Sequence, residues 1–402
     1  MSEYDRGQMS DTSRETPDPR DFLGLDGLLS DEEILLRDTV RSYVEKEINP
    51  NVAEWWNEGR IPHRDLATAF GELGMLGMHL DGYGCAGTSA TQYGLACLEL
   101  EAGDSGIRSF VSVQGSLVMF PIWEFGSEEQ KQTWLPRMAK GEVLGCFGLT
   151  EADSGSDPAS MRTNARRDGS DWVINGSKMW ITNGSIADVA IVWARTDQGI
   201  RGFIVPTDSA GFSAPEIKMK ASLRASVTSE LVLENVRVPE DFVLPEVSSM
   251  RGPLSCLNEA RFGIAFGATG AARSCYETAL SYAKEREQFG KPIASFQLTQ
   301  RKLVEMMVAV QRGILLAIHL GRRKDEGRLS PEQVSFGKLD NVRNALEVAR
   351  SARSVLGANG ITLEYPVFRH MANLETVSTY EGTHEIHTLV MGQAITGLNA
   401  FD

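Results

Sequence analysis

The hydrophobic pattern changes twice along the chain, and this division constrains the fold more than any other feature of the sequence. Up to about residue 144 the apolar residues recur at helical spacing, as at Leu36, Val40 and Tyr43. Short β-prone runs separated by turn pairs such as Asp168-Gly169 follow as far as residue 252. Helical spacing then returns and continues to the end. The sequence therefore predicts an α+β protein in which N-terminal and C-terminal helical bundles flank a small β-barrel or sandwich domain.

The length of 402 residues supports a division into several domains, because one ordinary core does not grow to that size. The first residues are polar, carry both charge signs and lack the apolar core of a signal peptide, so we expect them to be disordered. The expected segments are a disordered tail (1–26), an N-terminal helical domain (27–144), a middle β domain (145–252) and a C-terminal helical domain (253–402).

Charge and cysteine content argue against several classes of partner. The formal net charge of -14 and the pI of about 5.1 argue against a surface for nucleic acid or anionic membranes. The five cysteines are scattered and form no C-x-x-C pair, which favours reduced thiols over a disulfide framework or a zinc site. No run of 18 uncharged apolar residues is present, so we expect a cytoplasmic protein without a membrane span.

Two motifs match known binding patterns but lack the required context. Residues 82–87 fit G-x-G-x-x-G, yet the segment before them has helical rather than strand periodicity, which indicates a helix–helix loop instead of a dinucleotide site. His384 and His387 flank Glu385, but they are three residues apart where the zinc helix needs four, and no third ligand is evident. We therefore expect no bound metal.

The segment Tyr380-Glu381-Gly382-Thr383-His384-Glu385 offers a candidate general base. Gly382 marks a turn, and Thr383 is a suitable N-cap for the apolar-periodic run that follows. Glu381 would then lie on a turn beside the ring of Tyr380, and a carboxylate held there away from bulk water can abstract a proton. Taken alone, a solvated turn glutamate is the simpler interpretation.

A second candidate is the loop from Phe147 to Asp157, at the start of the expected β domain. It presents hydroxyls and backbone amides spaced by small residues, which could donate hydrogen bonds to a carbonyl-rich heterocycle or to phosphate. A Ser/Gly-rich linker is the alternative, and the loop by itself does not decide between the two.

The run Tyr-Glu-Gly-Thr-His-Glu-Ile-His at residues 380–387 closely resembles a segment near the C-terminus of acyl-CoA dehydrogenases. The surrounding segments are most similar to the glutaryl-CoA dehydrogenase branch of that family. The resemblance covers nearly the whole chain from about Gly27. It implies that Glu381 abstracts the α-proton of an acyl-CoA. It also implies that the backbone amide of Glu381 and a flavin ribityl hydroxyl hold the thioester oxygen.

The resemblance further implies FAD as the cofactor. The loop from Phe147 is similar to the family's flavin-binding segment, and Trp180 to the residue that packs on the isoalloxazine ring. The segment with Arg286 resembles one that reaches the FAD of a neighbouring subunit; the turn at Gly357 resembles one along that cofactor, although Ala358 replaces a glycine often seen there. The implied cofactor residues are Phe147, Leu149, Thr150, Gly155, Ser156, Trp180, Ile181, Thr182, Arg286, Phe289, Gln297, Leu356, Gly357, Thr383 and Glu385. Otherwise Arg286 would be a solvated helix residue and Gly357 a plain C-cap.

The implied substrate site contains Arg108. A fatty acyl chain offers no partner to an arginine on the apolar wall of an acyl pocket, and burying an unpaired arginine costs free energy. A dicarboxylic acyl chain supplies the missing anion, and the glutaryl-CoA branch looks similar at Arg108, Ser109 and Glu101. The other implied substrate residues are Ser156, Arg261, Tyr380 and Gly382. The alternative is an ordinary ion pair of Arg108 with Glu101 or Asp104.

The resemblance thus implies FAD-dependent oxidation and decarboxylation of glutaryl-CoA to crotonyl-CoA and CO2, by a homotetramer that passes electrons to an electron-transfer flavoprotein. Two other classes stay open. One is a dehydrogenase of another short-chain or branched acyl-CoA, and the other is a flavin-free structural homologue that kept only the fold. The rate with butyryl-CoA relative to glutaryl-CoA distinguishes the first, and FAD content distinguishes the second.

Overall fold

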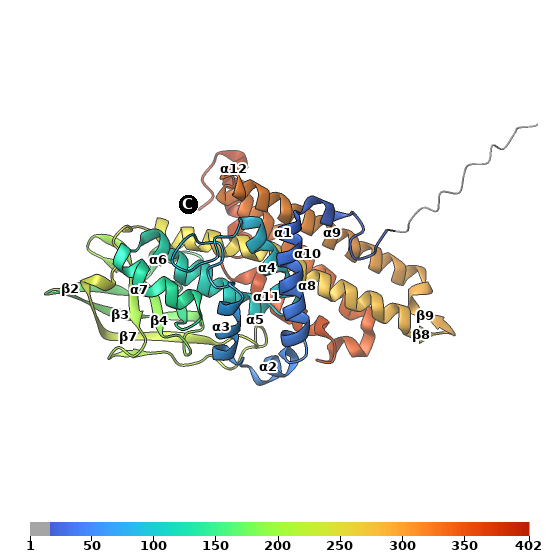
Figure 1. The fold of residues 1–402 in the computed structure, drawn as a ribbon, viewed down its shortest axis with the longest axis horizontal. Helices are drawn as coiled ribbons and strands as arrows, with labels where there is room; N and C mark the ends of the chain where they lie inside the picture. Colours follow the sequence, from blue (N-terminus) through green and yellow to red (C-terminus); the bar gives the residue numbers. More distant parts are fainter. Residues whose placement is uncertain (1–16, 402) are drawn as a thin grey trace, which may run out of the picture.

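The computed structural model describes residues 17–401. Along the chain, helices come before and after a curled sheet, which confirms the predicted α+β class (Figure 1). In Figure 1 the sheet occupies one end of the molecule, and the long C-terminal helices run toward the other end. The largest hydrophobic core includes side chains from both helical regions, from Val40 to Val334. The two bundles therefore pack as one body around shared helices.

The helices before the sheet are α1 (Asp31–Tyr43), α2 (Val52–Glu58), α3 (His63–Glu72), α4 (Ala90–Gly103), α5 (Ser105–Ser112), α6 (Phe120–Phe125) and α7 (Glu128–Ala139). Capping boxes at Ser30 and Ser127 begin α1 and α7. Helix α4 is buried along almost its whole length, and its carboxylates Glu99 and Glu101 therefore need partners inside the protein.

The middle strands are β1 (Gly145–Gly148), β2 (Asn164–Asp168), β3 (Asp171–Thr182), β4 (Val189–Thr196), β5 (Gly199–Pro206), β6 (Phe212–Ser213) and β7 (Thr228–Pro239). They form one sheet in the order β1-β4-β2-β3-β7-β6, with β5 also paired to β4. Trp172, Phe203 and Leu231 pack in its core. The pairing of β3 with β7 shifts register between Lys178 and Ile181, and such a bulge redirects the side chains within it.

The elements after the sheet are α8 (Arg251–Glu285), β8 (Glu287–Gln288), β9 (Lys291–Pro292), α9 (Gln297–Asp325), α10 (Pro331–Leu356), α11 (Pro366–Thr379) and α12 (His384–Thr396). Helix α8 packs between α4 and α10. Two of its glycines allow a close approach to α4, because a Cβ on Gly267 would lie 2.0 Å from Oε2 of Glu101 and one on Gly270 would lie 1.9 Å from the carbonyl oxygen of Leu98. This contact fixes Glu101 against α8.

Helix α9 is long and apolar enough to cross a membrane by length and composition, and it is the one such helix between residues 17 and 401. Of its most apolar window, 44% is buried, and the helix packs against α8, α10 and α4. A core helix passes the same test, so length and composition are weak evidence for a membrane span here.

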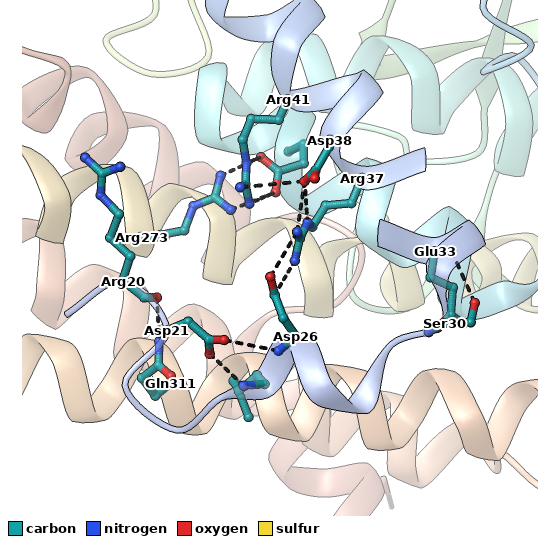
Figure 2. Close-up of polar contacts among 12 residues, drawn as sticks. Arg20, Asp21, Asp26, Ser30, Glu33, Arg37, Asp38, Arg41, Arg273 and Gln311 are labelled. Atoms are coloured by element: carbon teal, nitrogen blue, oxygen red, sulfur yellow. Dashed lines mark hydrogen bonds and ion pairs between the residues drawn. The ribbon is translucent and has the colours of Figure 1, made fainter. Parts of the chain in front are cut away.

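The expectation of a disordered tail up to residue 26 does not hold for its last part (Figure 2). Residues 1–16 lie outside the described residues, but residues 20–26 make defined contacts. The side chain of Gln311 on α9 donates to the carbonyl oxygen of Arg20 at 2.9 Å and accepts from the amide of Leu23 at 3.2 Å. The carboxylate of Asp21 accepts from two amides of the next turn. Polar composition alone does not reveal such side-chain caps.

Candidate active site

The segment between α11 and α12 folds as the predicted turn. Glu381 and Gly382 take positive φ angles of 52° and 94°, and Thr383 caps α12 by accepting a hydrogen bond from the amide of Ile386. A positive φ is costly for a glutamate, so surrounding contacts must hold this turn. Oε2 of Glu381 is shielded from solvent and has no hydrogen-bond partner among the described residues. The carboxylate is therefore not that of a solvated turn residue.

Burial and nearby charged groups together set the basicity of Glu381. Burial is the largest influence, and it raises the pKa of the Glu381 carboxyl above its ordinary value. The positive charges of Arg108, Lys338 and Arg261 act in the opposite direction, whereas the negative charge of Glu101 adds to the rise. A carboxylate with a raised pKa and a free oxygen is suited to accept a proton from a weak carbon acid.

Two cations bind the backbone of the turn. Nε of Arg261 on α8 donates to the carbonyl oxygen of Glu381 at 2.7 Å. Nζ of Lys338 on α10 donates to the carbonyl oxygens of Tyr380 and Gly382, at 2.5 and 2.6 Å. Arg261 is predicted as a substrate contact, and here it meets the turn itself. Lys338 was not predicted from the sequence. Its only signal there is that a lysine occupies a position on the buried, otherwise largely apolar face of α10.

Arg108 on α5 links this turn to α4. Its Nε donates to Oε2 of Glu101 at 2.6 Å, and its Nη2 donates to the hydroxyl of Tyr380. Arg108 and Glu101 are fully buried, yet Nη1 of Arg108 and Oε1 of Glu101 have no partner within residues 17–401. Asp104 pairs with an arginine of α11 instead. Of the two ion pairs considered for Arg108, only the one with Glu101 forms, and it leaves one guanidinium nitrogen free.

The two predicted flavin segments lie side by side in the β domain. The amide of Met179 donates to the carbonyl oxygen of Thr150 at 2.8 Å, which joins β3 to the loop after β1. Nζ of Lys178 donates to a carbonyl of that loop and to Oε1 of Glu151 at 2.9 Å, a buried pair that sequence reasoning missed. Trp180 has a φ of 65° and is 60% exposed. The bulge therefore presents the indole at the surface, where a flat aromatic ring could pack on it.

The remaining predicted residues fall into two groups. Phe147, Leu149, Gly155 and Ser156 lie in β1 or the loop after it, Ile181 and Thr182 end β3, Ser109 is buried on α5, and Glu385 lies in the first turn of α12. Arg286, Phe289 and Gln297 lie around the β8–β9 hairpin, and Leu356 and Gly357 lie where α10 ends. In Figure 1 the hairpin is at the opposite end of the molecule from β2 and β3. One chain does not bring this hairpin to the loops of the β domain.

The two motifs set aside on context have the following surroundings. Residues 82–87 connect α3 to α4, and their glycines at 82, 84 and 87 take positive φ angles in a loop that no strand between residues 17 and 81 precedes. His387 is buried at the start of α12 beside Gly382. No group of three His, Cys, Asp or Glu side chains that could hold a metal ion occurs in the part of the chain that the structure describes.

Comparisons with known proteins identify the family to which this chain belongs. Sequence models of the acyl-CoA dehydrogenase N-terminal, middle and C-terminal domains match residues 30–142, 146–236 and 250–396. A crystal structure of glutaryl-CoA dehydrogenase from Mycobacterium smegmatis has a TM-score of 0.95 and 65% sequence identity, and the match covers 96% of this chain and 100% of that one. A second structure of a glutaryl-CoA dehydrogenase from the same organism, in complex with FADH2, has the same TM-score and coverage at 60% identity.

More distant relatives span both substrate types. Glutaryl-CoA dehydrogenase of Desulfococcus multivorans is 35% identical over 380 residues, covering 91% of this chain and 97% of the relative. The mitochondrial short-chain specific acyl-CoA dehydrogenase of Bos taurus is 34% identical over 364 residues, covering 89% of this chain and 88% of the relative. The family expected from the sequence is confirmed by all three domain matches. The chain is therefore a member of the acyl-CoA dehydrogenase family.

Proposed function

We propose that this acyl-CoA dehydrogenase oxidises glutaryl-CoA and removes CO2 from the product to give crotonyl-CoA. The observation that carries the proposal is the buried guanidinium of Arg108, which keeps Nη1 without a partner among the described residues while Nη2 binds Tyr380 next to Glu381. A butyryl chain offers nothing to a buried cation, whereas the γ-carboxylate of a glutaryl chain can accept its hydrogen bonds. The two solved glutaryl-CoA dehydrogenases, at 65% and 60% identity, support the same substrate.

Glu381 is the base in this proposal. It accepts the α-proton of the acyl chain, and FAD, when bound, supplies the acceptor for the β-hydride. Because burial raises the pKa of Glu381, the base is lost as the pH falls through a value above that of an ordinary glutamate. We expect the backbone amide of Glu381 to hold the thioester oxygen, where negative charge develops as the proton leaves.

The decarboxylation uses the same residues. Oxidation leaves a double bond conjugated to the thioester, with the carboxylate one carbon beyond it. Loss of CO2 leaves an electron pair on the acyl chain, which must take up one proton. Glu381, protonated in the first step, is the acid that faces the chain. Glu101 and Tyr380 share the hydrogen bonds of Arg108, so the guanidinium keeps partners when the carboxylate departs.

FAD is the cofactor, and the residues present fit it. The exposed indole of Trp180 suits a flavin ring, and the loop at Thr150 lies directly beside it. Arg286 and Phe289 are exposed far from these residues, so they would meet FAD only across an interface with a second copy. Four exposed apolar side chains on α9 support association with further copies of the chain: Leu298, Val304, Val308 and Leu315. We propose a homotetramer, and light scattering measures the number of subunits. We assign reoxidation of the flavin to an electron-transfer flavoprotein.

A dehydrogenase of another short-chain or branched acyl-CoA is the second candidate. The identity to the bovine short-chain enzyme, 34%, is close to the 35% identity to the Desulfococcus glutaryl-CoA dehydrogenase. The pairing of Arg108 with Glu101 also allows a purely structural role for this arginine. A flavin-free homologue is distinguished by its colour, since it would purify without flavin absorbance and take up no FAD.

Anaerobic mixing of the FAD-loaded protein with glutaryl-CoA or butyryl-CoA tests the proposal. Glutaryl-CoA should bleach the flavin absorbance faster than butyryl-CoA does. A single turnover with an artificial electron acceptor should then give crotonyl-CoA and one equivalent of CO2. Equal bleaching by both substrates would favour the second candidate. Glutaconyl-CoA as the final product would make the enzyme a non-decarboxylating one.

A further inference from the structure

Lys338 is a buried lysine that no part of the proposed reaction uses. It lies on α10, more than 40 residues before the base in sequence, and it is fully buried. Its hydrogen bonds within residues 17–401 go to two backbone carbonyls, and none of its contacts there is an ion pair. A lysine deprived of water without a carboxylate partner is unfavourable. Burial accordingly lowers the pKa of Lys338 to about 7.

The two carbonyls that Lys338 binds belong to the residues on either side of Glu381. Arg261 binds the carbonyl of Glu381 itself. Three consecutive peptide planes are therefore fixed by two side chains that come from different helices. Because these planes define the backbone angles of Glu381, they also define the direction of its Cα–Cβ bond. The positive φ of Glu381 shows that this direction is not one the free chain would prefer.

We propose that Lys338 is a positioning residue for the general base, which holds Glu381 and Gly382 at their positive φ angles and places its charge beside Glu381. The inference rests on the proposed role of Glu381, but it does not depend on which acyl-CoA is the substrate. A role limited to the end of α11 is the alternative, since Tyr380 is the C-cap of that helix and lysines commonly bind the last carbonyls of a helix. The second bond, to Gly382, lies outside the helix and favours the role at the base.

The charge of Lys338 has a consequence for the pH profile. Its positive charge favours the ionised form of Glu381, so its removal should move the acid limb of the profile to higher pH. The titratable and charged groups that face this site are Cys97 and Glu101 from α4, Arg108 from α5, Arg261 from α8, Tyr380 and Glu381 from the turn, and His384 and His387 from α12. The pKa of His387 is lowered to about 3 by burial and nearby cations, so this group stays neutral across the working range.

Lys220 provides a matched control. It too donates to two backbone carbonyls, those of Leu223 and Ser226, and burial lowers its pKa to about 8. It lies in the loop before β7, and its bonds hold no part of the base turn. Lys220→Met therefore removes the same kind of contact from a loop outside the catalytic machinery.

The test compares Lys338→Met and Lys220→Met as FAD-loaded holoenzymes. We expect anaerobic flavin reduction to fall about 10²-fold in Lys338→Met, because a small misplacement of a reacting group has an effect of that size. Its acid limb should move to higher pH, and hydrogen exchange should become faster in peptides covering residues 380–386. Lys220→Met should leave all three unchanged. A rate within about threefold of the wild type, with an unmoved acid limb, would overturn the proposal.

Two further arms keep the result interpretable. The rate of flavin reduction is measured with both butyryl-CoA and glutaryl-CoA. A wrong substrate assignment changes the relative rates in the wild type, whereas a wrong role for Lys338 is seen only when the variant is compared with the wild type. If Lys338→Met does not hold FAD, Lys338→Gln takes its place, because it keeps an N–H donor and removes the charge. A shifted acid limb in Lys338→Gln supports the proposal, and an unshifted one contradicts it.

Discussion

Two carboxylates of α4 lie two residues apart, are buried to the same degree and face arginines, yet they differ in what surrounds them. Glu99 accepts four hydrogen bonds, from Arg273 at 2.7 and 2.6 Å and from Arg41 at 2.9 and 3.2 Å. Arg41 and Arg273 come from α1 and α8 and converge in Figure 2. Glu101 accepts one bond from Arg108, and its Oε1 has no partner among residues 17–401.

The two clusters differ in whether their buried polar atoms all have partners within the described residues. At Glu99 the arginines outweigh burial and lower the pKa of the carboxyl to about 2. Around Glu101, free polar atoms remain on Arg108 and Glu381 as well, although each is shielded from water. Buried polar groups normally find partners inside the protein, so an incomplete set indicates that a ligand provides the rest. We therefore propose that Glu99 contributes to stability and that the cluster at Glu101 contacts the substrate.

Replacing the base should have the largest effect on catalysis. Glu381→Gln keeps the size of the side chain but cannot accept the α-proton, so anaerobic flavin reduction should fall by about 10²- to 10⁴-fold. Binding of FAD and acyl-CoA should be retained. Stopped-flow absorbance measures the rate of flavin reduction, and equilibrium dialysis measures the binding. Near-normal flavin reduction would place the base elsewhere, with Glu101 as the next candidate.

Breaking the complete cluster should act on stability instead. Glu99→Gln leaves Arg273 buried without its anion, and removing one partner of a buried pair typically costs about 3–5 kcal/mol. The thermal midpoint should therefore fall clearly, while flavin reduction in the folded variant stays near that of the wild type. Glu58→Gln, which breaks an exposed pair with Arg60, is the control and should change the midpoint little. A large loss of flavin reduction in folded Glu99→Gln would remove the contrast between the clusters.

Acid should remove the same stability without a mutation. The folded pKa of Glu99, about 2, is lower than that of an exposed glutamate, so its ionised form stabilises the fold above the unfolded pKa. That contribution, roughly 3 kcal/mol, is lost as the pH falls from about 4.5 to about 2. The difference in urea stability between the wild type and Glu99→Gln should accordingly shrink from pH 7 to pH 3. An unchanged difference would mean that Glu99 does not ionise within this cluster.

How far the sequence predicts this site depends on whether a residue's role is local. Glu381, Tyr380 and Arg108 lie in segments with a recognisable order of residues, and the structure brings them together. Lys338 has no such segment, because its role arises only when α10 packs behind a turn more than 40 residues further along the chain. A lysine at an apolar position of a helix is the signal that could have found it.

In the fold, too, local features are predictable and contacts between distant segments are not. Hydrophobic periodicity predicts the order of helical and β regions, because it depends on residues near one another in sequence. The contacts of residues 20–26 with Gln311 depend on the approach of segments nearly 300 residues apart. The exposure of Trp180 follows from a register shift between β3 and β7, which the alternation within either strand does not encode.

The central claim is that Arg108 recognises a carboxylate on the substrate, and the most direct measurement is the relative kcat/KM for glutaryl-CoA and butyryl-CoA in the wild type and in Arg108→Ala. A charge-assisted hydrogen bond contributes about 1.5–3 kcal/mol, so the preference for glutaryl-CoA should fall by roughly 10- to 100-fold in the variant. If both substrates slow by the same factor, Arg108 is a structural partner of Glu101, and the assignment of glutaryl-CoA loses its physical support.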